Sequence, residues 1–207
     1  MREDRKPWRY ALVQHPMWLI IAEDSVCLER TPPWGCASLE DYIARLGRGL
    51  DAIEAYPGLR LTFDISAVEL EDASARCPEL VGRIRGLVAR GLVSLVNGTY
   101  SQPHLQTLSI ESSIRQFEHG MRSIQELTGC RVRCYAAQEP GLTPYLPQIL
   151  RSMGYATAAT PDFPFGVRLT GGQIQHWDKR WEWLAGDDIV DWTAPDGSAV
   201  PLWLKSS

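Results

Sequence analysis

Residues 77–98, CPELVGRIRGLVARGLVSLVNG, contain one complete helix–turn–strand unit. Pro78 suits the first turn of a helix, and apolar residues recur after it at helical spacing. Gly91 is a natural end for that helix, because glycine adopts the left-handed conformation without steric cost. The apolar run at residues 92–96 has the length of a strand and stops at the turn signal of residues 97–98. This stretch therefore predicts a helix followed by a buried strand.

The same alternation continues on both sides of this unit. It predicts strands at residues 10–13, 18–22, 59–65, 92–96, 131–137 and 155–160, and helices that begin near Ser38, Pro78, Ser109 and Thr143. Strands that alternate with helices indicate a parallel sheet with covering helices, so the fold class is α/β. Residues 189–204 predict a β-hairpin that turns at residues 194–197. We expect one domain over residues 1–207, with a β/α core at 1–165 and an irregular segment plus the hairpin at 166–207.

Composition excludes several classes of protein. The chain has 207 residues, of which 44% are hydrophobic and 22% charged, and its net charge is −4 with no basic tract that would favour nucleic acid. The apolar stretch at residues 18–22 is too short to span a bilayer, and the charged N-terminus does not resemble a signal peptide. Five cysteines without a CxxC motif are typical of reduced thiols. We expect a cytoplasmic protein without a membrane anchor.

Tryptophan is abundant, with eight residues, five of them between Trp177 and Trp203. Aromatic rings stack on the apolar faces of sugars, but they also fill cores and cover interfaces. We weigh the structural interpretation above the sugar-binding one.

Active sites of parallel sheets lie at the carboxyl ends of the strands. The segments that follow the predicted strands are residues 14–16, 64–66, 97–104 and 138–140. These segments contain histidines, carboxylates and amides, which are the side chains that bind metals and sugars. The candidate site is therefore expected on this rim.

Five collinear segments carry a resemblance to a known family. They are YPGLRLTFDIS at residues 56–66, CPELVGRIRGLVARGLVSLVNGTYSQPH at 77–104, IESSIRQFEHGMRSIQELTGCRVRCYAAQEPG at 110–141, LPQILRSMGYATAAT at 146–160 and DWTAPDGSAVP at 191–201. Together they resemble the N-terminal catalytic domain of family 38 glycoside hydrolases, the α-mannosidases. Their common order is more specific than any one segment.

The resemblance implies a distorted (β/α)7 barrel of the glycoside hydrolase and deacetylase type, which would be incomplete here. It also implies cleavage of α-mannosides with retention of configuration, in which one carboxylate attacks the anomeric carbon and a second carboxyl group about 5 Å away protonates the leaving oxygen. Family members hold a zinc ion with an N-terminal His-x-Asp pair, the nucleophilic aspartate and a later histidine. They continue into further C-terminal domains, so this chain could be a fragment.

The chain departs from the family pattern at the positions that carry the chemistry. Alignment through Trp18 leaves His15 as the one ligand of the N-terminal metal pair. Alignment through the LPQIL segment puts Gln138, which cannot act as a nucleophile, on the family aspartate, with Glu139 beside it. His104 stands in a loop that is acidic in family members. A zinc site built from His15 and His104, with Glu139, is therefore one hypothesis, and loop or capping histidines are the other.

From these positions we predict the site residues. Glu139 and Asp64 are the catalytic candidates, with a surface or capping role as the alternative for each. The substrate-binding candidates are Gln138, Tyr100, Gln102 and Trp18, and the metal candidates are His15 and His104.

Three functions follow from these residues. The first is an α-mannosidase-like retaining hydrolase, or part of one, with a carbohydrate substrate and zinc as its cofactor. The second is a non-catalytic carbohydrate-binding relative that has lost the metal site. The third, a metal-dependent polysaccharide deacetylase, ranks last because its Asp-Asp pair and His-x-x-x-His motif are missing from the sequence.

Overall fold

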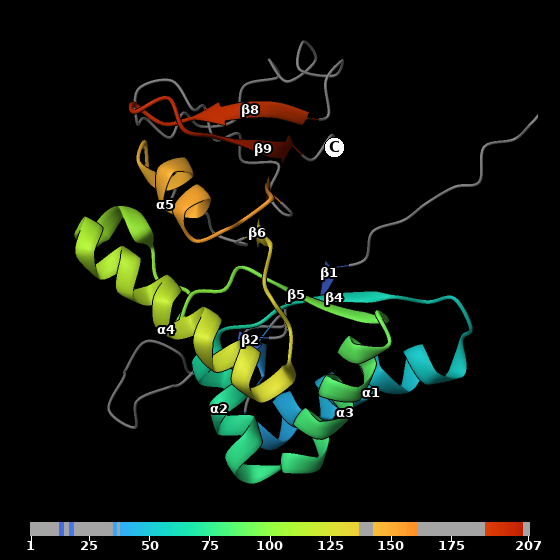
Figure 1. Ribbon diagram of the computed structural model, residues 1–207. Helices are drawn as coiled ribbons and strands as arrows, with labels where there is room; N and C mark the ends of the chain where they lie inside the picture. The colour runs from blue at the N-terminus through green and yellow to red at the C-terminus, as the bar shows by residue number, and fades with distance from the viewer. Residues whose placement is uncertain are drawn as a thin grey trace, which may run out of the picture.

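The computed structural model describes residues 13–14, 17–18, 35–36, 38–136, 143–160 and 189–204 (Figure 1). Its strands are β1 (Val13–Gln14), β2 (Met17–Trp18), β3 (Gly35–Cys36), β4 (Leu61–Asp64), β5 (Val93–Val96), β6 (Cys134–Ala136), β7 (Thr157–Thr160), β8 (Ile189–Thr193) and β9 (Ala199–Leu204). Its α-helices are α1 (Leu39–Ala55), α2 (Ala67–Arg76), α3 (Pro78–Ala89), α4 (Ile110–Thr128) and α5 (Leu146–Ser152), and a short 3₁₀ helix, η1, spans Leu105–Thr107. This order confirms the mixed α/β fold.

The described strands form three sheets, with the orders β1-β4-β5, β2-β3 and β6-β7-β9-β8. All their pairings are parallel except that of β8 with β9. The Asn97 N–H, directly after β5, donates to the Cys134 carbonyl oxygen in β6 at 3.1 Å and joins the first sheet to the third. Over the described residues these sheets do not close, so the barrel that the resemblance implies is not confirmed.

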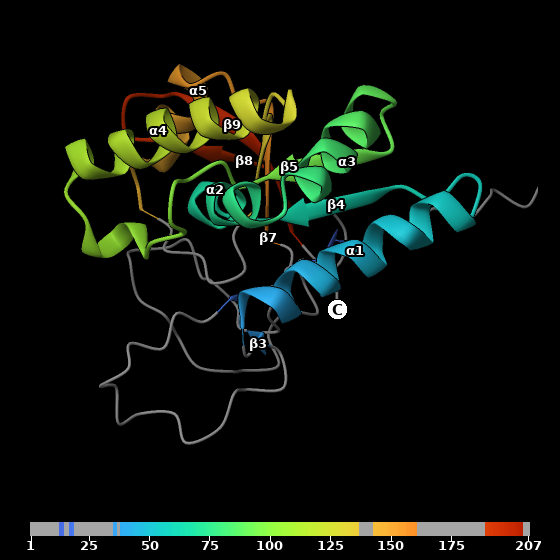
Figure 2. The same ribbon diagram turned by 90° about the horizontal axis from the view of Figure 1, so that it is seen from below.

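The long helices cover one side of the strands. Seen from below, α4 crosses in front of α5 and the β8–β9 hairpin, and β4 lies between α1 and α3 (Figure 2). Three fully or almost fully buried rings join α4 to the third sheet: the Phe117 ring centroid lies 5.8 Å from that of Tyr135 and 5.7 Å from that of Tyr155, both in edge-to-face geometry. Since Tyr135 faces α4, its neighbours Cys134 and Ala136 project from the opposite face of β6.

Two predicted helix starts are confirmed by capping hydrogen bonds. The Ser38 hydroxyl oxygen accepts from the Asp41 N–H at 3.1 Å, and the Ser109 hydroxyl oxygen accepts from the Ser112 N–H at 3.1 Å. The fourth predicted helix begins at Leu146 rather than at Thr143. Thr143 precedes a proline, and the residue before proline avoids the helical conformation.

Helix α2 was not predicted. Ser66 and Glu69 form a capping box at its start, in which the Glu69 N–H donates to the Ser66 hydroxyl oxygen at 3.4 Å and the Ser66 N–H donates to the Glu69 carboxylate at 3.0 Å. The sequence signal, Ser-x-x-Glu after a strand, was present at these positions. Cys77 alone separates α2 from Pro78, the first residue of α3.

The C-terminal turn of α4 is held by another helix. The Arg85 guanidinium, on α3, donates to the carbonyl oxygens of Leu127 at 3.0 Å and Glu126 at 2.6 Å. These carbonyls belong to the last turn of a helix, where no further backbone N–H is available to them. Gly129 then ends α4 in the left-handed conformation, with φ 73°.

The C-terminal hairpin is confirmed. Strands β8 and β9 pair antiparallel, and the Gly197 N–H donates to the Ala194 carbonyl oxygen at 3.0 Å across the predicted turn. The hairpin attaches to the third sheet because β9 pairs parallel with β7.

Candidate active site

A buried carboxylate ends β4. Asp64 is 1% exposed and lies beside Val96, the last residue of β5, in the parallel register. Its Oδ1 atom accepts hydrogen bonds from the Gln102 Nε2 at 2.8 Å and from the Asn97 Nδ2 at 3.3 Å. The structure therefore brings together Asp64 and Gln102, two residues that the sequence assigned to the site. Donors that converge on a buried carboxylate offset the loss of its hydration.

Asn97 is a member of this cluster that the sequence placed at a turn and on the expected rim, but that was not among the predicted site residues. It is 2% exposed and has φ 70°, a left-handed conformation that asparagine tolerates better than most residues. Its Oδ1 accepts from the Thr99 hydroxyl at 2.9 Å, and its carbonyl oxygen accepts from the Tyr155 hydroxyl at 2.7 Å. Asn97 thus links the carboxylate to the loop on one side and to the core on the other.

The loop after β5 rests on two helices. The Val68 N–H, in the first turn of α2, donates to the Tyr100 carbonyl oxygen at 3.0 Å, and the Tyr100 N–H donates to the Gln116 carbonyl oxygen of α4 at 2.9 Å. Gly120 of α4 permits this approach, since a Cβ atom there would lie 2.6 Å from the Tyr100 nitrogen and closer still to Gly98 and Thr99. Backbone hydrogen bonds and the close approach to Gly120 therefore hold the loop in place at residues 98–100, just before Gln102.

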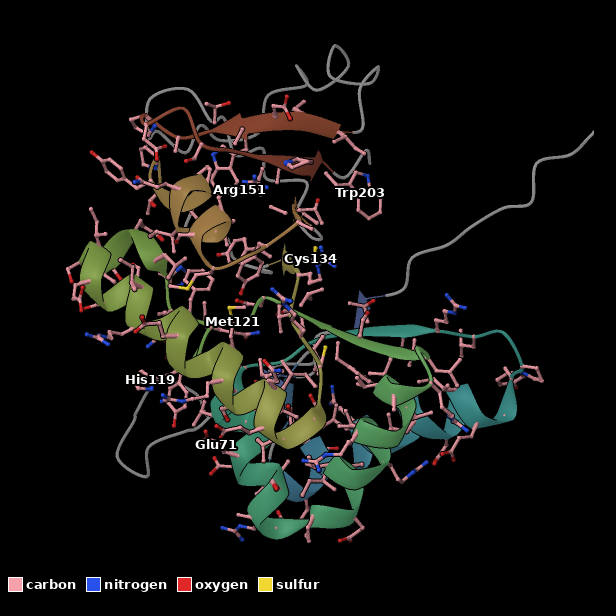
Figure 3. All side chains as sticks on the ribbon, viewed as in Figure 1. Glu71, His119, Met121, Cys134, Arg151 and Trp203 are labelled. Carbon is pink, nitrogen blue, oxygen red and sulfur yellow. The ribbon has the colours of Figure 1, made fainter. Side chains whose placement is uncertain are left out.

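Tyr100, a substrate-binding candidate, is oriented by a glutamate. Its hydroxyl donates to the Glu71 carboxylate of α2 at 2.9 Å, and the Ser123 hydroxyl of α4 donates to the other oxygen of Glu71 at 2.6 Å. Figure 3 labels Glu71 where α2 meets α4. The hydrogen bond to Glu71 raises the pKa of Tyr100, so its hydroxyl stays protonated.

Cys134 lies close enough to Asp64 to respond to its charge. Burial, and to a smaller extent the negative charge of Asp64, raises the pKa of the Cys134 thiol to about 11. The same two causes raise the pKa of Tyr135. Cys134 is therefore an uncharged thiol near pH 7, and it is not a nucleophile. Its place near the middle of the molecule is visible in Figure 3.

Changing Asp64 to asparagine should lower the pKa of Cys134. The substitution removes the negative charge but not the burial, which is the larger cause, so the pKa should fall below 11 and stay above the ordinary value of 9.0. Alkylation of Cys134, followed against pH by mass spectrometry, measures the shift. Cys77 is the internal control, because its raised pKa arises first from a hydrogen bond with Glu79. An unchanged Cys134 profile would show that Asp64 does not act on this thiol.

The raised pKa of Cys134 makes the stability of the fold depend on pH in a known direction. A raised folded-state pKa favours the folded protein while the thiol is protonated, and that contribution is lost as the pH rises from about 9 to about 11. In the Asp64→Asn variant the loss should be complete at a lower pH. Denaturant unfolding across this window tests the sign.

His104 is an exposed residue at the start of η1. Its carbonyl oxygen accepts from the Thr107 N–H at 2.9 Å and from the Thr107 hydroxyl at 2.7 Å. In the part of the chain that the structure describes, no three His, Cys, Asp or Glu side chains gather into a group that could hold a metal ion. The described residues therefore do not supply a zinc site.

The other site candidates cannot be placed. His15, Gln138 and Glu139 lie outside the described residues, and Trp18 is described only as backbone within β2. The shared rim that we expected for His15, His104 and Glu139 stays a prediction.

Comparison with known proteins identifies the domain. Residues 49–193 match the family described as "Glycosyl hydrolases family 38 N-terminal domain". The chain belongs to this family. The matched residues of this family 38 domain include all the elements from the second half of α1 to the end of β8, and with them Asp64, Asn97 and Gln102. No curated protein sequence matches the chain.

Solved structures resemble the fold of this family 38 domain at low identity. A 4-alpha-glucanotransferase from Thermococcus litoralis has 14% identity and a TM-score of 0.64, over 95% of this chain and 27% of that one. An alpha-mannosidase from Enterococcus faecalis V583 has 19% identity and a TM-score of 0.62, over 94% and 20%. A family 38 protein from Enterococcus faecalis has 16% identity and a TM-score of 0.58, over 97% and 19%. The domain thus spans about a fifth to a quarter of these chains. Within its described residues, no helix is long and apolar enough to cross a membrane.

Proposed function

We propose that this family 38 domain is an α-mannosidase-like glycoside hydrolase domain, or part of one, that acts on α-linked sugars with retention of configuration. The observation that carries the proposal is the family match over residues 49–193, which spans the buried polar cluster at the carboxyl ends of β4 and β5. Amides and hydroxyls at the strand ends of a parallel sheet are suited to bind the hydroxyls of a sugar.

The residues of the rim take separate roles in this proposal. The Glu139 carboxylate attacks the anomeric carbon while the bond to the leaving oxygen breaks, and a second carboxyl group about 5 Å away protonates that oxygen. The same carboxyl group, now ionised, takes a proton from the water that hydrolyses the resulting ester. Gln102 and Tyr100 belong to the loop that contacts the sugar. Asp64, at 1% exposure and engaged by two amides, positions that loop rather than reacting with the sugar. Gln138 binds a sugar hydroxyl.

Zinc is the cofactor that the resemblance to family 38 implies for this domain. His15 and His104 are our candidate ligands, and the described residues contain no group of three or more His, Cys, Asp or Glu side chains that could hold a metal ion. Elemental analysis of the purified chain tests this zinc site. A stoichiometric zinc content that falls in His15→Ala and His104→Ala would support the site. An active protein without metal would refute it.

The experiment for the proposed function is turnover of an aryl α-mannoside by the purified chain. The expected result is release of the phenol, with the α-anomer of mannose as the first product in a proton NMR time course. An initial β-anomer would overturn the retaining mechanism. Absence of turnover, both in this chain and in any longer protein that contains it, would overturn the proposed hydrolase.

The second candidate function is sugar binding without turnover. Gln138 favours it, because an amide stands where the resemblance places the attacking carboxylate, and an amide cannot form the covalent intermediate. A measurable affinity for methyl α-D-mannopyranoside together with no hydrolysis would select this candidate over the first.

A further inference from the structure

A carboxylate on α2 joins the loop after β5 to α4. Glu71 accepts a hydrogen bond at each of its two oxygens, from the Tyr100 hydroxyl at 2.9 Å and from the Ser123 hydroxyl at 2.6 Å. Ser123 is buried, and Glu71 and Tyr100 are half-buried. Hydrogen bonds to a charged acceptor are roughly twice as strong as those between neutral groups. Glu71, labelled in Figure 3, therefore ties one side chain of the loop to two helices at once.

The residue that Glu71 holds comes two positions before the site residue Gln102. The Tyr100 side chain packs against the hydrophobic core, and its backbone is hydrogen-bonded to α2 and α4. Gln102 then adopts a left-handed backbone, with φ 51°, from which its amide reaches the Asp64 carboxylate at 2.8 Å. Such a backbone costs free energy in residues other than glycine, and it persists where the surroundings fix it. The position of Gln102 therefore depends on how firmly Tyr100 is held.

The alternative is that Glu71 only stabilises the packing of α2 on α4. A carboxylate is a poor choice for that purpose, because a charge that leaves water loses hydration, and apolar side chains of similar volume often stabilise a fold as well or better. What a carboxylate supplies is direction. An ionised carboxylate only accepts hydrogen bonds, so the Tyr100 hydroxyl must point its hydrogen at Glu71. The contact thus favours one orientation of the side chain that anchors the loop.

We propose that Glu71 is a positioning residue for sugar binding, which fixes Tyr100 and thereby holds Gln102 in place beside Asp64. Glu71 does not touch the sugar, and it acts through the loop. This proposal rests on the proposed function for the chemical class of its ligand, a hexopyranoside. It adds to the candidate site a residue of α2 that lies in the helical layer and not at the end of a strand.

The first test is calorimetric titration of the whole chain with methyl α-D-mannopyranoside. Glu71→Ala should weaken binding by about tenfold, because the loop loses a hydrogen bond to a charged group. Glu71→Gln should recover most of the affinity, since an amide can still bond to both hydroxyls. Tyr100→Phe removes the same hydrogen bond but keeps the ring in the core, and it should weaken binding about as much as Glu71→Ala. The matched control is Asp72→Asn, which removes a negative charge from the next position of α2 and leaves the hydrogen bond to Tyr100 intact.

A double variant distinguishes positioning from a merely structural role. If Glu71 acts through Gln102, then Glu71→Ala should change the affinity little in a chain that already carries Gln102→Ala. A purely structural effect would instead weaken binding by the same factor in both backgrounds. Additive losses, or a Tyr100→Phe chain that binds the sugar as tightly as the unmodified chain, would overturn the proposal and leave the proposed function standing. Circular dichroism confirms that each variant is folded.

Amide hydrogen exchange without sugar separates the failure of this proposal from that of the proposed function. The Tyr100 and Ser101 amides donate to the backbone and side-chain oxygens of Gln116, at 2.9 Å and 3.0 Å. Both amides should exchange faster in Glu71→Ala, because the loop opens more often. Faster exchange in a chain that binds no α-mannoside would support the hold of Glu71 on the loop and overturn the proposed function. Unchanged exchange would overturn the positioning role.

Discussion

Changing Glu139 to glutamine is expected to reduce the hydrolysis of an aryl α-mannoside by about 10³-fold or more. An amide of the same size cannot attack the anomeric carbon, so the covalent intermediate would not form. Binding of the sugar should change little, because glutamine keeps the shape and one hydrogen-bond acceptor. The measurement is kcat for the variant beside the Kd of methyl α-D-mannopyranoside.

Two further results make the assignment to Glu139 specific. Glu126→Gln is the matched control, because Glu126 is an exposed glutamate on α4 and should retain full activity. A fluorinated glycosyl fluoride, whose covalent intermediate hydrolyses slowly, should form an ester with the Glu139 carboxylate and release fluoride. Mass spectrometry would then find the sugar on the peptide that contains Glu139. A sugar on another carboxylate, or full activity in Glu139→Gln, would refute the assignment.

Changing Gly120 to alanine is expected to destabilise the domain by about 1–3 kcal/mol. The added Cβ would lie 2.6 Å from the Tyr100 nitrogen and nearer still to backbone atoms of Gly98 and Thr99, and backbone cannot move aside as the end of a side chain can. Alanine favours the helix over glycine by only about 0.5–1 kcal/mol. The clash is the larger effect, so the free energy of unfolding should fall. Urea unfolding followed by circular dichroism measures it.

Gly82 provides the opposite result on a neighbouring helix. It lies on α3 with no atom within 4 Å of its Cβ position, so Gly82→Ala should stabilise the domain by about 0.5–1 kcal/mol. Gly120→Ala should also weaken sugar binding, because the displaced loop carries Gln102. Equal stability of Gly120→Ala and the unmodified chain would show that α4 and the loop are not in such close contact.

Local chemistry explains why most helices could be predicted from sequence. Ser38 and Ser109 cap helices whose apolar faces repeat at regular spacing, so the start and the period agree. Helix α2 was missed because Cys77 alone separates it from the next helix. The capping box of Ser66 and Glu69 was the signal that could have found it.

The candidate site was less predictable, because its contacts join residues far apart in the sequence. Asp64 and Gln102 were predicted separately, because each follows a strand and active sites of parallel sheets lie at the carboxyl ends of the strands. Their hydrogen bond depends on the left-handed backbone of Asn97 and of Gln102, with φ 70° and 51°. Asparagine before glycine suggests such a backbone at Asn97, but nothing in the local sequence indicates it at glutamine. Whether Glu139 joins them depends on residues that follow β6 and lie beyond the described part of the chain.

The hydrogen bonds from Arg85 to the last turn of α4 affect how the domain unfolds locally. Helix termini normally fray in nanoseconds and exchange their amide hydrogens first, whereas the last turn of α4 is tied to α3 through the carbonyl oxygens of Glu126 and Leu127. Unwinding that turn breaks the hydrogen bonds from the Arg85 guanidinium, so α3 and α4 should open as one cooperative unit. Amide hydrogens near residue 128 should then exchange as slowly as those in the middle of α3. In Arg85→Ala, the C-terminal turn of α4 should exchange faster while the middle of α3 stays protected.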